Sequence, residues 1–221
     1  AAAKLAAQIQ GVPLYKYLRK TFLPEKTDFP MPALLMNMIN GGAHAENNLD
    51  FQEYLAIFED GSIESRLESA SKFYLGLKEK LKKEFGQEAV GLGDEGGVIG
   101  KNFTLLREAD KAPAIREGMN EGILRSLGEG GCASEGFARR SEWGSTSNEQ
   151  PLKILSELIK DDGYGEKIKL GIDVAASQFF QKGDYQLEGK KISKTELLEV
   201  YKNLFKNFPL VYLLEDIFEE N

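Results

Sequence analysis

Two acidic residues occupy a short loop in which glycines flank them on both sides. The loop reads Gly93-Asp94-Glu95-Gly96-Gly97. Glycine lets the backbone approach a ligand closely, so that a neighbouring carboxyl group can point toward that ligand. The alternative interpretation is an ordinary acidic turn, because glycine and aspartate are both common in turns. The loop therefore indicates a site only in combination with other residues.

Two further carboxylates, Asp173 and Glu215, each follow an apolar run that is typical of a buried strand. A buried carboxylate without a partner is costly, so such groups usually meet a cation, a metal ion or several hydrogen-bond donors. Ligation by oxygen alone favours magnesium or manganese over zinc. From these two positions alone, metal binding and a purely structural role remain comparable interpretations.

Three more candidates lie between residues 41 and 54. His44 follows Gly41 and Gly42 in a loop, and its near-neutral pKa suits catalysis, although a lone histidine is more often structural. Gln52 and Glu53 are adjacent on a predicted strand. Adjacent strand residues face opposite sides, so only one of them can face an active site unless a bulge intervenes. A solvated strand face is the alternative for either.

The elements around these residues follow from periodicity and end signals. Residues 1–9 read as a short helix, and 33–39 and 51–58 as neighbouring strands. Apolar residues at helical spacing predict a long helix between an N-cap at Ser62 and Gly86.

In the second half, helices and strands alternate. A helix over 152–159 precedes a strand over 168–173, and the capping box of Ser193 and Glu196 opens another helix. The apolar run 210–214 predicts a strand buried on both faces. This alternation indicates the α/β class, with βα units around a parallel sheet or barrel. A barrel of that type carries its chemistry at the carboxyl ends of its strands, where Asp173 and Glu215 stand.

Residues 103–143 break this order. They are rich in glycine and charge, show poor apolar periodicity and contain the chain's one cysteine and one tryptophan, Cys132 and Trp143. We expect an insertion here, because a structureless connection of that length usually means a functional lid, a disordered segment or a foreign piece.

Composition excludes several classes of protein. With 28 basic and 35 acidic residues the net charge is -7, so no positive field attracts nucleic acid or an anionic membrane. One cysteine cannot form an internal disulfide, and one cysteine with one histidine excludes the usual zinc frameworks. We expect a cytoplasmic protein without a leader or a membrane span, and a chain cut at both ends.

Five ordered motifs resemble the enolase family, particularly its bacterial-type members. They are PLYKYL at 13–18, NMINGGAHAENNLDFQEYL at 37–55, GDEGG at 93–97, GIDVAASQFF at 171–180 and LLEDIF at 213–218. The resemblance implies part of a TIM-type barrel that begins with two antiparallel strands before its βα units. Residues 1–30 would end the N-terminal domain, and 31–221 would form the first part of the barrel. Full-length members are commonly homodimers.

The same resemblance implies an activity and roles for residues. Enolases interconvert 2-phosphoglycerate and phosphoenolpyruvate plus water, using Mg²⁺. By position in the motifs, Glu95 and Glu53 would be catalytic acids and His44 and Gln52 would contact substrate. Asp173 and Glu215 would be two of the three carboxylate ligands of the metal.

The chain also departs from the family pattern. The lysine base, the third metal ligand and the main phosphate-binding residues of the family have no counterpart among the 221 residues. Gln178 replaces a common glutamate, and Ile217 a common proline or glycine. Two other hypotheses therefore stand beside an enolase: a degenerate or truncated enolase-like protein that only binds a partner, and another acid-sugar dehydratase, against which the GGAHA, QE and GDEGG set argues.

Overall fold

The computed structural model describes residues 1–45, 47–93, 96–100 and 147–220. The chain divides into two compact units, Ala1–Pro32 and Ala33–Asn221. The expected insertion at 103–143 lies outside the described residues, as do Asp94 and Glu95.

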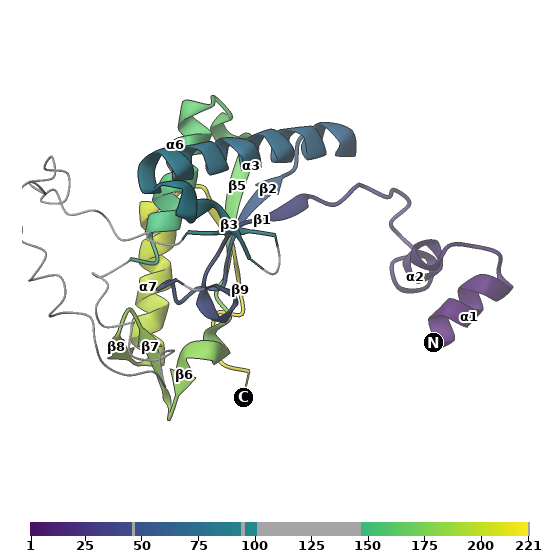
Figure 1. The fold of residues 1–221 in the computed structure, drawn as a ribbon. Coiled ribbons are helices and arrows are strands. Elements are labelled where there is room, and N and C mark those ends of the chain that lie inside the picture. Colours follow the sequence, from purple (N-terminus) through teal and green to yellow (C-terminus); the bar gives the residue numbers. More distant parts are fainter. Residues whose placement is uncertain (46, 94–95, 101–146, 221) are drawn as a thin grey trace, which may run out of the picture. The chain divides into compact units, whose positions relative to one another are not determined.

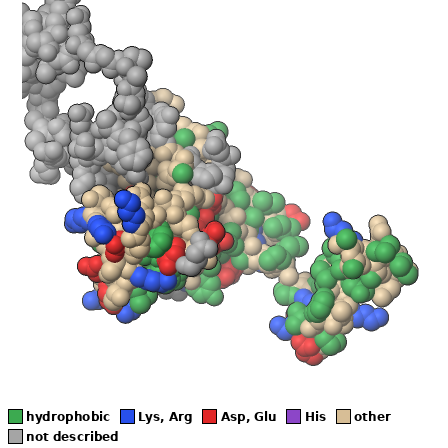
Figure 2. Space-filling view, turned by 90° about the horizontal axis from the view of Figure 1, so that it is seen from below, with side chains coloured by type: hydrophobic (Ala, Val, Ile, Leu, Met, Phe, Trp, Pro, Cys, Tyr) green, Lys and Arg blue, Asp and Glu red, His purple; other side chains and the backbone are tan. Residues whose placement is uncertain are grey.

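The first unit contains two helices, α1 (Ala2–Ile9) and α2 (Leu14–Phe22). The sequence predicted α1 but not α2. Pro13 was read as a stop signal for the first helix, yet it lies directly before the first residue of α2, and proline is also favoured where a helix begins. Ala7 is the one buried residue of this unit, and hydrophobic side chains cover much of its surface (Figure 2).

The second unit contains a six-stranded sheet in the order β3-β4-β1-β2-β5-β9 (Figure 1). Its central strands are β1 (Leu34–Asn40), β2 (Glu53–Phe58) and β5 (Ile168–Asp173). Strand β2 runs antiparallel to both of its neighbours, whereas β9 (Val211–Glu215) runs parallel to β5. The expected antiparallel start followed by a parallel pair is therefore confirmed, and the described strands form an open sheet.

Two very short strands extend the sheet beyond β1. They are β3 (Gly91–Leu92) and β4 (Val98–Ile99), which pair antiparallel with each other. Strand β4 also pairs parallel with the end of β1, matching Asn40 with Ile99. The glycine loop 93–97 is the connection between these two short strands, so pairing brings its ends to the end of β1.

The long helix α3 (Ile63–Phe85) begins and ends as the sequence predicts. The Ser62 hydroxyl accepts a hydrogen bond from the Ser65 N–H, and Gly86 takes φ 87° after the last turn. Its buried side chains, among them Phe73, Leu77 and Leu81, face β1, β2 and the helix α6 (Gln150–Asp161) (Figure 1). The helix thus covers one face of the central strands and fixes their position.

One prediction about the last strand is wrong. The run 210–214 was expected to be buried on both faces, but Tyr212 in β9 is 68% exposed. Strand β9 is an edge strand among the described residues, and helix α7 (Lys194–Asn207) packs against it. The capping box predicted at Ser193 and Glu196 is present at the start of α7.

A second, three-stranded sheet follows β5. It consists of β6 (Phe180–Gln181), β7 (Asp184–Leu187) and β8 (Lys190–Ile192). The buried Tyr185 ring packs against the rings of Phe179, Phe180 and Phe218, and so joins this sheet to the core.

A polar cluster ties three distant segments together. It consists of three buried residues, Asp50, Tyr54 and Asn148, and the exposed Glu188, and we call it the buried polar cluster. The Asn148 amide oxygen accepts from the Asp50 N–H at 2.8 Å, and its amide nitrogen donates to Asp50 Oδ2 at 3.1 Å and to Glu188 Oε1 at 3.3 Å. The Tyr54 hydroxyl donates to the Asn148 carbonyl at 2.9 Å. Burial, followed by the charges of Asp50 and Glu188, raises the pKa of Tyr54 well above its usual range. The cluster joins β2, the residues before α6 and the turn between β7 and β8.

Candidate functional site at the strand ends

Four polar residues form a row across one end of the six-stranded sheet. Strand register pairs Asn40 with Glu53, Glu53 with Asp173, and Asp173 with Glu215. Residues paired directly across neighbouring strands point to the same face, with Cβ atoms about 5 Å apart. Three predicted site residues, distant in the sequence, therefore lie side by side in this strand-end row.

The backbone beyond β5 and β9 holds two of these carboxylates at the edge. The Val174 N–H donates to the Glu215 carbonyl and the Ala176 N–H to the Asp216 carbonyl, both at 3.0 Å. Ala175 and Asp216 both take a positive φ of 47°, which is uncommon for residues other than glycine. The two strands thus turn together directly after Asp173 and Glu215. Strained backbone at a sheet end of this kind is typical of functional sites.

The carboxylates of the row differ in their surroundings. Glu215 is exposed, whereas Glu53 and Asp173 are half buried. Asp173 Oδ1 accepts a hydrogen bond from the Ala175 N–H at 3.0 Å, which orients that carboxylate. All three lie at the end of the sheet where β1, β5 and β9 finish.

The glycine loop is fixed to the first residue of the row. Gly93 donates its N–H to the Gly97 carbonyl at 2.8 Å, and the Tyr74 hydroxyl of α3 donates to the Gly96 carbonyl at 2.8 Å. A Cβ atom on Gly97 would lie 1.9 Å from Asn40 Oδ1, and one on Gly93 would lie 2.7 Å from Asn40 Nδ2. Only glycine lets this loop lie so close to Asn40. Glu95 itself lies outside the described residues, but both ends of its loop lie at the strand-end row.

Asn40, the last residue of β1, lies in the strand-end row but was not among the predicted site residues. It is fully buried, and its Oδ1 accepts from Asn37 Nδ2 at 2.9 Å. Its Nδ2 has no hydrogen-bond partner within the described ranges. The sequence did contain an indication of its role, namely two asparagines inside an otherwise apolar strand. A buried amide usually has a specific hydrogen-bond partner.

His44 and Gln52 lie in segments that adjoin the row. The short 3-10 turn Gly42–His44 follows β1, and Gly42 takes φ 58°; the side chain of His44 is outside the described set. Gln52 continues the ladder of β2: its N–H donates to the Asp173 carbonyl at 3.1 Å, and its carbonyl accepts from the Gly41 N–H at 2.8 Å. A register irregularity in β1 between Asn37 and Ile39 lies opposite the start of β2.

The carboxylates of the row are suitable ligands for a divalent metal ion, but too few of them come close together to hold one. Asp173 and Glu215 offer carboxylate oxygens from paired positions, which suits Mg²⁺. Within the described ranges no three histidine, cysteine, aspartate or glutamate side chains come close enough together to hold a metal ion. The described residues alone therefore do not form a metal site.

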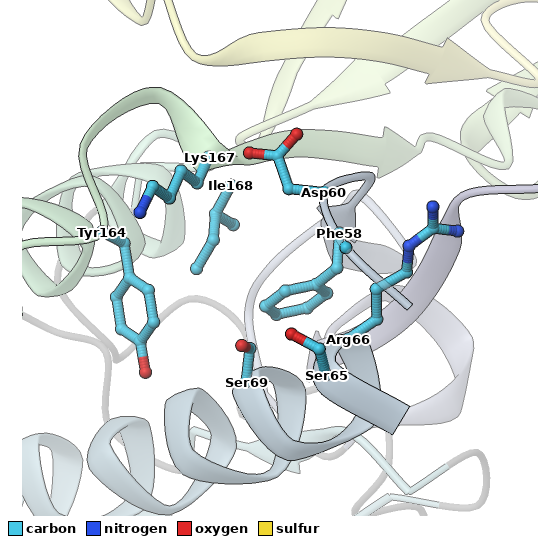
Figure 3. A pocket seen from close by; sticks show the side chains of 9 residues that line it. Phe58, Asp60, Ser65, Arg66, Ser69, Tyr164, Lys167 and Ile168 are labelled. Carbon is cyan, nitrogen blue, oxygen red and sulfur yellow. The ribbon is translucent and has the colours of Figure 1, made fainter. Parts of the chain in front are cut away.

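The pocket in Figure 3 lies at the other end of the strands. It has a volume of about 240 Å³ and is lined by residues from the end of β2, the first turns of α3 and the start of β5, including Phe58, Arg66 and Ile168. Phe58 pairs with Ile168 at the end opposite to the Glu53 and Asp173 pair. None of the predicted site residues lines this pocket.

Comparison with known proteins decides the family. A family model described as "Enolase, C-terminal TIM barrel domain" matches residues 28–119 and 130–221. This chain belongs to the enolase family. The open sheet, with its antiparallel start and its parallel β5 and β9, is thus part of an enolase barrel. The unmatched residues 120–129 lie inside the stretch where an insertion is expected, which is outside the described residues.

Individual enolases align with the whole or most of the chain. The enolase of Methanocaldococcus jannaschii is 31% identical over 222 aligned residues, which cover 100% of this chain and 41% of that protein. The enolase of Aeropyrum pernix is 37% identical over 196 residues, covering 86% of this chain and 35% of that protein. The enolase of Thermococcus kodakarensis is 31% identical, with coverages of 100% and 41%. The chain spans about two fifths of the length of these relatives.

These relatives are archaeal, so the bacterial type suggested by the motifs is not confirmed. Among the described helices, none is both long and apolar enough to cross a bilayer.

Proposed function

We propose that the protein containing this chain is a Mg²⁺-dependent carbon-oxygen lyase that interconverts 2-phosphoglycerate and phosphoenolpyruvate plus water. The observation that supports this most is the strand-end row, in which Glu53, Asp173 and Glu215 occupy paired positions beside the glycine loop of Glu95. Membership of the enolase family supports the substrate and the reaction.

In this proposal the residues divide by position along the row. Asp173 and Glu215, paired on β5 and β9, supply two ligands to the metal ion. Glu53 and Glu95 work beside Asn40, where a carboxylic acid can give a proton to the departing hydroxyl so that it leaves as water. His44 and Gln52 contact the substrate from the adjoining segments.

The reaction requires a group that stabilises negative charge on the substrate, and the proposed roles of the row's residues meet this requirement. Loss of a proton next to a carboxylate builds up negative charge on the substrate, and a bound divalent cation would stabilise that charge. The acidic row cannot stabilise an anion by itself, because its own charges repel one. Carboxylates of the row are useful to such a substrate as metal ligands and as proton carriers.

The first experiment measures formation of phosphoenolpyruvate from 2-phosphoglycerate by the complete protein that contains this chain. We expect activity that requires Mg²⁺ and that falls at least about a hundredfold in Asp173→Asn, because a ligand is weakened. Glu79→Gln is a matched control, since Glu79 is an exposed acid on α3. Activity that survives both removal of the metal and Asp173→Asn would contradict the proposal.

The second experiment uses the 221-residue chain alone. We expect no conversion of 2-phosphoglycerate, because the described residues supply no complete metal site and the family pattern places the lysine base outside these 221 residues. Turnover by this chain would mean that the base has been misassigned. Inactivity of the complete protein, with retained binding of 2-phosphoglycerate, would instead favour a non-catalytic enolase-like binding protein.

The cellular setting belongs to the same proposal. A small phosphorylated substrate, one cysteine and a net charge of -7 support a cytoplasmic enzyme that does not bind nucleic acid. Homodimerisation, common in the family, is proposed for the complete protein and is tested by its mass in solution.

A further inference from the structure

The segment that follows β9, residues 216–220, is hydrogen-bonded at both of its ends to the turn that follows β5. At its start, the Asp216 carbonyl accepts from the Ala176 N–H at 3.0 Å. At its end, the Glu220 N–H donates to the Ser177 hydroxyl oxygen at 3.2 Å. The segments that follow the two proposed metal ligands are therefore bonded to each other.

Glu219 holds this segment from another side, through its carboxylate. Its Oε2 accepts from the hydroxyl of Tyr185 on β7, and its own N–H donates to that hydroxyl oxygen at 3.4 Å. Its Oε1 lies 3.2 Å from the Nζ of Lys194, the first residue of α7. The ring of Phe218 lies against the same two side chains, 4.6 Å from Lys194 Nζ and 6.5 Å from the Tyr185 ring. We call Tyr185, Lys194 and Glu219 the Glu219 clamp.

The hydrogen bond from Tyr185 is the stronger part of this clamp. Tyr185 is fully buried, so without Glu219 its hydroxyl would be left in the interior without this partner. The Lys194 side chain is 58% exposed, and ion pairs at the surface contribute little because water and salt screen them. We therefore expect loss of the hydroxyl to loosen the segment more than loss of the ammonium group.

The position of Glu215 depends on the backbone on both sides of it, because its own side chain is exposed. Before it, β9 pairs with β5. After it, Asp216 takes a positive φ of 47°, and backbone of this kind persists only where the surroundings impose it. Ile217 stands where the family pattern commonly has proline or glycine, so no proline ring restricts the backbone there. The contacts of the segment, including the clamp, then keep this turn in place.

We propose that Glu219 is a positioning residue, which holds the segment 216–220 and thereby keeps the Glu215 carboxylate beside Asp173. This inference rests on the proposed function, because it concerns the placement of a metal ligand assigned there. Glu219 itself contacts neither metal nor substrate in this assignment and acts through the backbone. Loss of a group that orients a metal ligand typically weakens metal binding by about tenfold or more.

The placement is tested on the 221-residue chain, without metal or substrate, by hydrogen exchange of single backbone amides. The Val174 N–H reports on the site, because it donates to the Glu215 carbonyl. The Ala176 N–H reports on the turn after it, because it donates to the Asp216 carbonyl. The Leu170 N–H donates to the carbonyl directly before β9, at the other end of the same strands, and reports on the fold.

In Glu219→Ala we expect exchange at Val174 and Ala176 to quicken about tenfold, the size expected for loss of one hydrogen bond, and exchange at Leu170 to stay unchanged. Glu199→Ala is the matched control, because Glu199 forms an exposed ion pair on α7, and it should leave all three amides unchanged. Equal quickening at all three amides in Glu219→Ala, or at none of them, would overturn the inference.

The effect on the metal is tested in the complete protein by titrating Mg²⁺ and following the rise in Tm. We expect Glu219→Ala to weaken Mg²⁺ binding about tenfold, with a smaller change in KM for 2-phosphoglycerate at saturating Mg²⁺. Glu219→Gln keeps an oxygen that can accept from the Tyr185 hydroxyl, so it should retain most of the affinity. Native affinity in Glu219→Ala would overturn the inference.

A double-mutant cycle with Tyr185→Phe separates positioning from direct contact with the metal. If Glu219 acts through the clamp, Tyr185→Phe also weakens Mg²⁺ binding, and Glu219→Ala then adds little to it. Native affinity in Tyr185→Phe, beside weakened affinity in Glu219→Ala, would overturn the inference, because Glu219 would then be a ligand itself. If the complete protein shows neither Mg²⁺ binding nor turnover, the proposed function fails, while the exchange comparison still decides whether Glu219 holds the backbone of Glu215.

Discussion

The buried polar cluster and the strand-end row contain similar polar side chains in different surroundings. In the cluster, Asp50 is 8% exposed and Asn148 is 3% exposed, and hydrogen-bond partners on separate segments of the chain surround them. In the row, Glu215 is exposed and Asp173 is half buried, and each is the last residue of its strand, with a positive φ angle shortly after it. The buried groups of the cluster bond to one another within the protein, whereas the row ends in a carboxylate, Glu215, that lies on the surface.

This difference separates structural from functional acids. Side chains whose hydrogen bonds are made inside the fold stabilise it, and their loss leaves buried groups without partners. Carboxylates held together at an edge repel each other, so they cost stability unless a ligand joins them. Substitutions in the cluster should therefore mainly lower the free energy of unfolding. Substitutions in the row should mainly lower activity.

The largest effect on stability is expected for Asn148→Ala in the cluster. It removes the amide that holds Asp50 and Glu188, so the free energy of unfolding should fall by about 3 kcal/mol. Urea unfolding measures the change. Asn203→Ala is the control, because Asn203 is exposed on α7 and should change stability little. Equal effects of the two substitutions would remove the distinction between cluster and surface.

A smaller loss of stability is expected for Gly97→Ala at the glycine loop. The new Cβ would lie 1.9 Å from Asn40 Oδ1, which forces the loop or β1 to move at a cost of about 2 kcal/mol. Displacement of Glu95 should also lower activity of the complete protein about a hundredfold. Gly91→Ala is the matched control, since its Cβ would meet no atom within 4 Å. Full activity in Gly97→Ala would show that the loop does not contribute to the site.

A still smaller, pH-dependent effect is expected at the capping box of α7. Hydrogen bonds from the Ser193 backbone and side chain lower the pKa of Glu196 from its ordinary value of 4.5. A lowered folded-state pKa stabilises the protein above the unfolded pKa, and this contribution is lost as pH falls through the folded value. Glu196→Gln should lower Tm near neutral pH and lose that effect in acid. Glu79→Gln, compared at the same pH values, should show no such trend.

The smallest stability effect is expected for Glu215→Gln in the row. Its free energy of unfolding without metal should stay within about 0.5 kcal/mol of the native value, because Glu215 is exposed. Stabilisation by Mg²⁺, measured as the rise in Tm on adding the ion to the complete protein, should be largely lost. A clear loss of stability without metal would place Glu215 among the structural acids.

Much of the second unit could be predicted from the sequence because local signals and burial agree there. The limits of α3, its N-cap at Ser62 and the capping box of Ser193 depend on near neighbours in the chain. Strand β5 ends at Asp173 as its apolar run indicates. Helix α2 was missed because Pro13 is compatible both with the end of one helix and with the start of the next.

The structural surroundings of the candidate site could be predicted only in part. Asp173, Glu215 and Glu53 were named from residue type and motif, whereas Asn40 was not, because an asparagine before two glycines is an ordinary turn signal. The exposure of Tyr212 was also missed, since an apolar run does not reveal that its strand lies at the edge of the described sheet.

The sequence by itself determined the family, the order of the main strands and helices of the second unit, and the carboxylates at the strand ends. Motifs and periodicity are properties of neighbouring residues, so they can be read from the chain. Only the tertiary structure decided that Asn40, Glu53, Asp173 and Glu215 share one row, and that Tyr185 and Lys194 contact Glu219. Register and long-range hydrogen bonds depend on how distant segments pack together, and no local pattern in the chain specifies that packing.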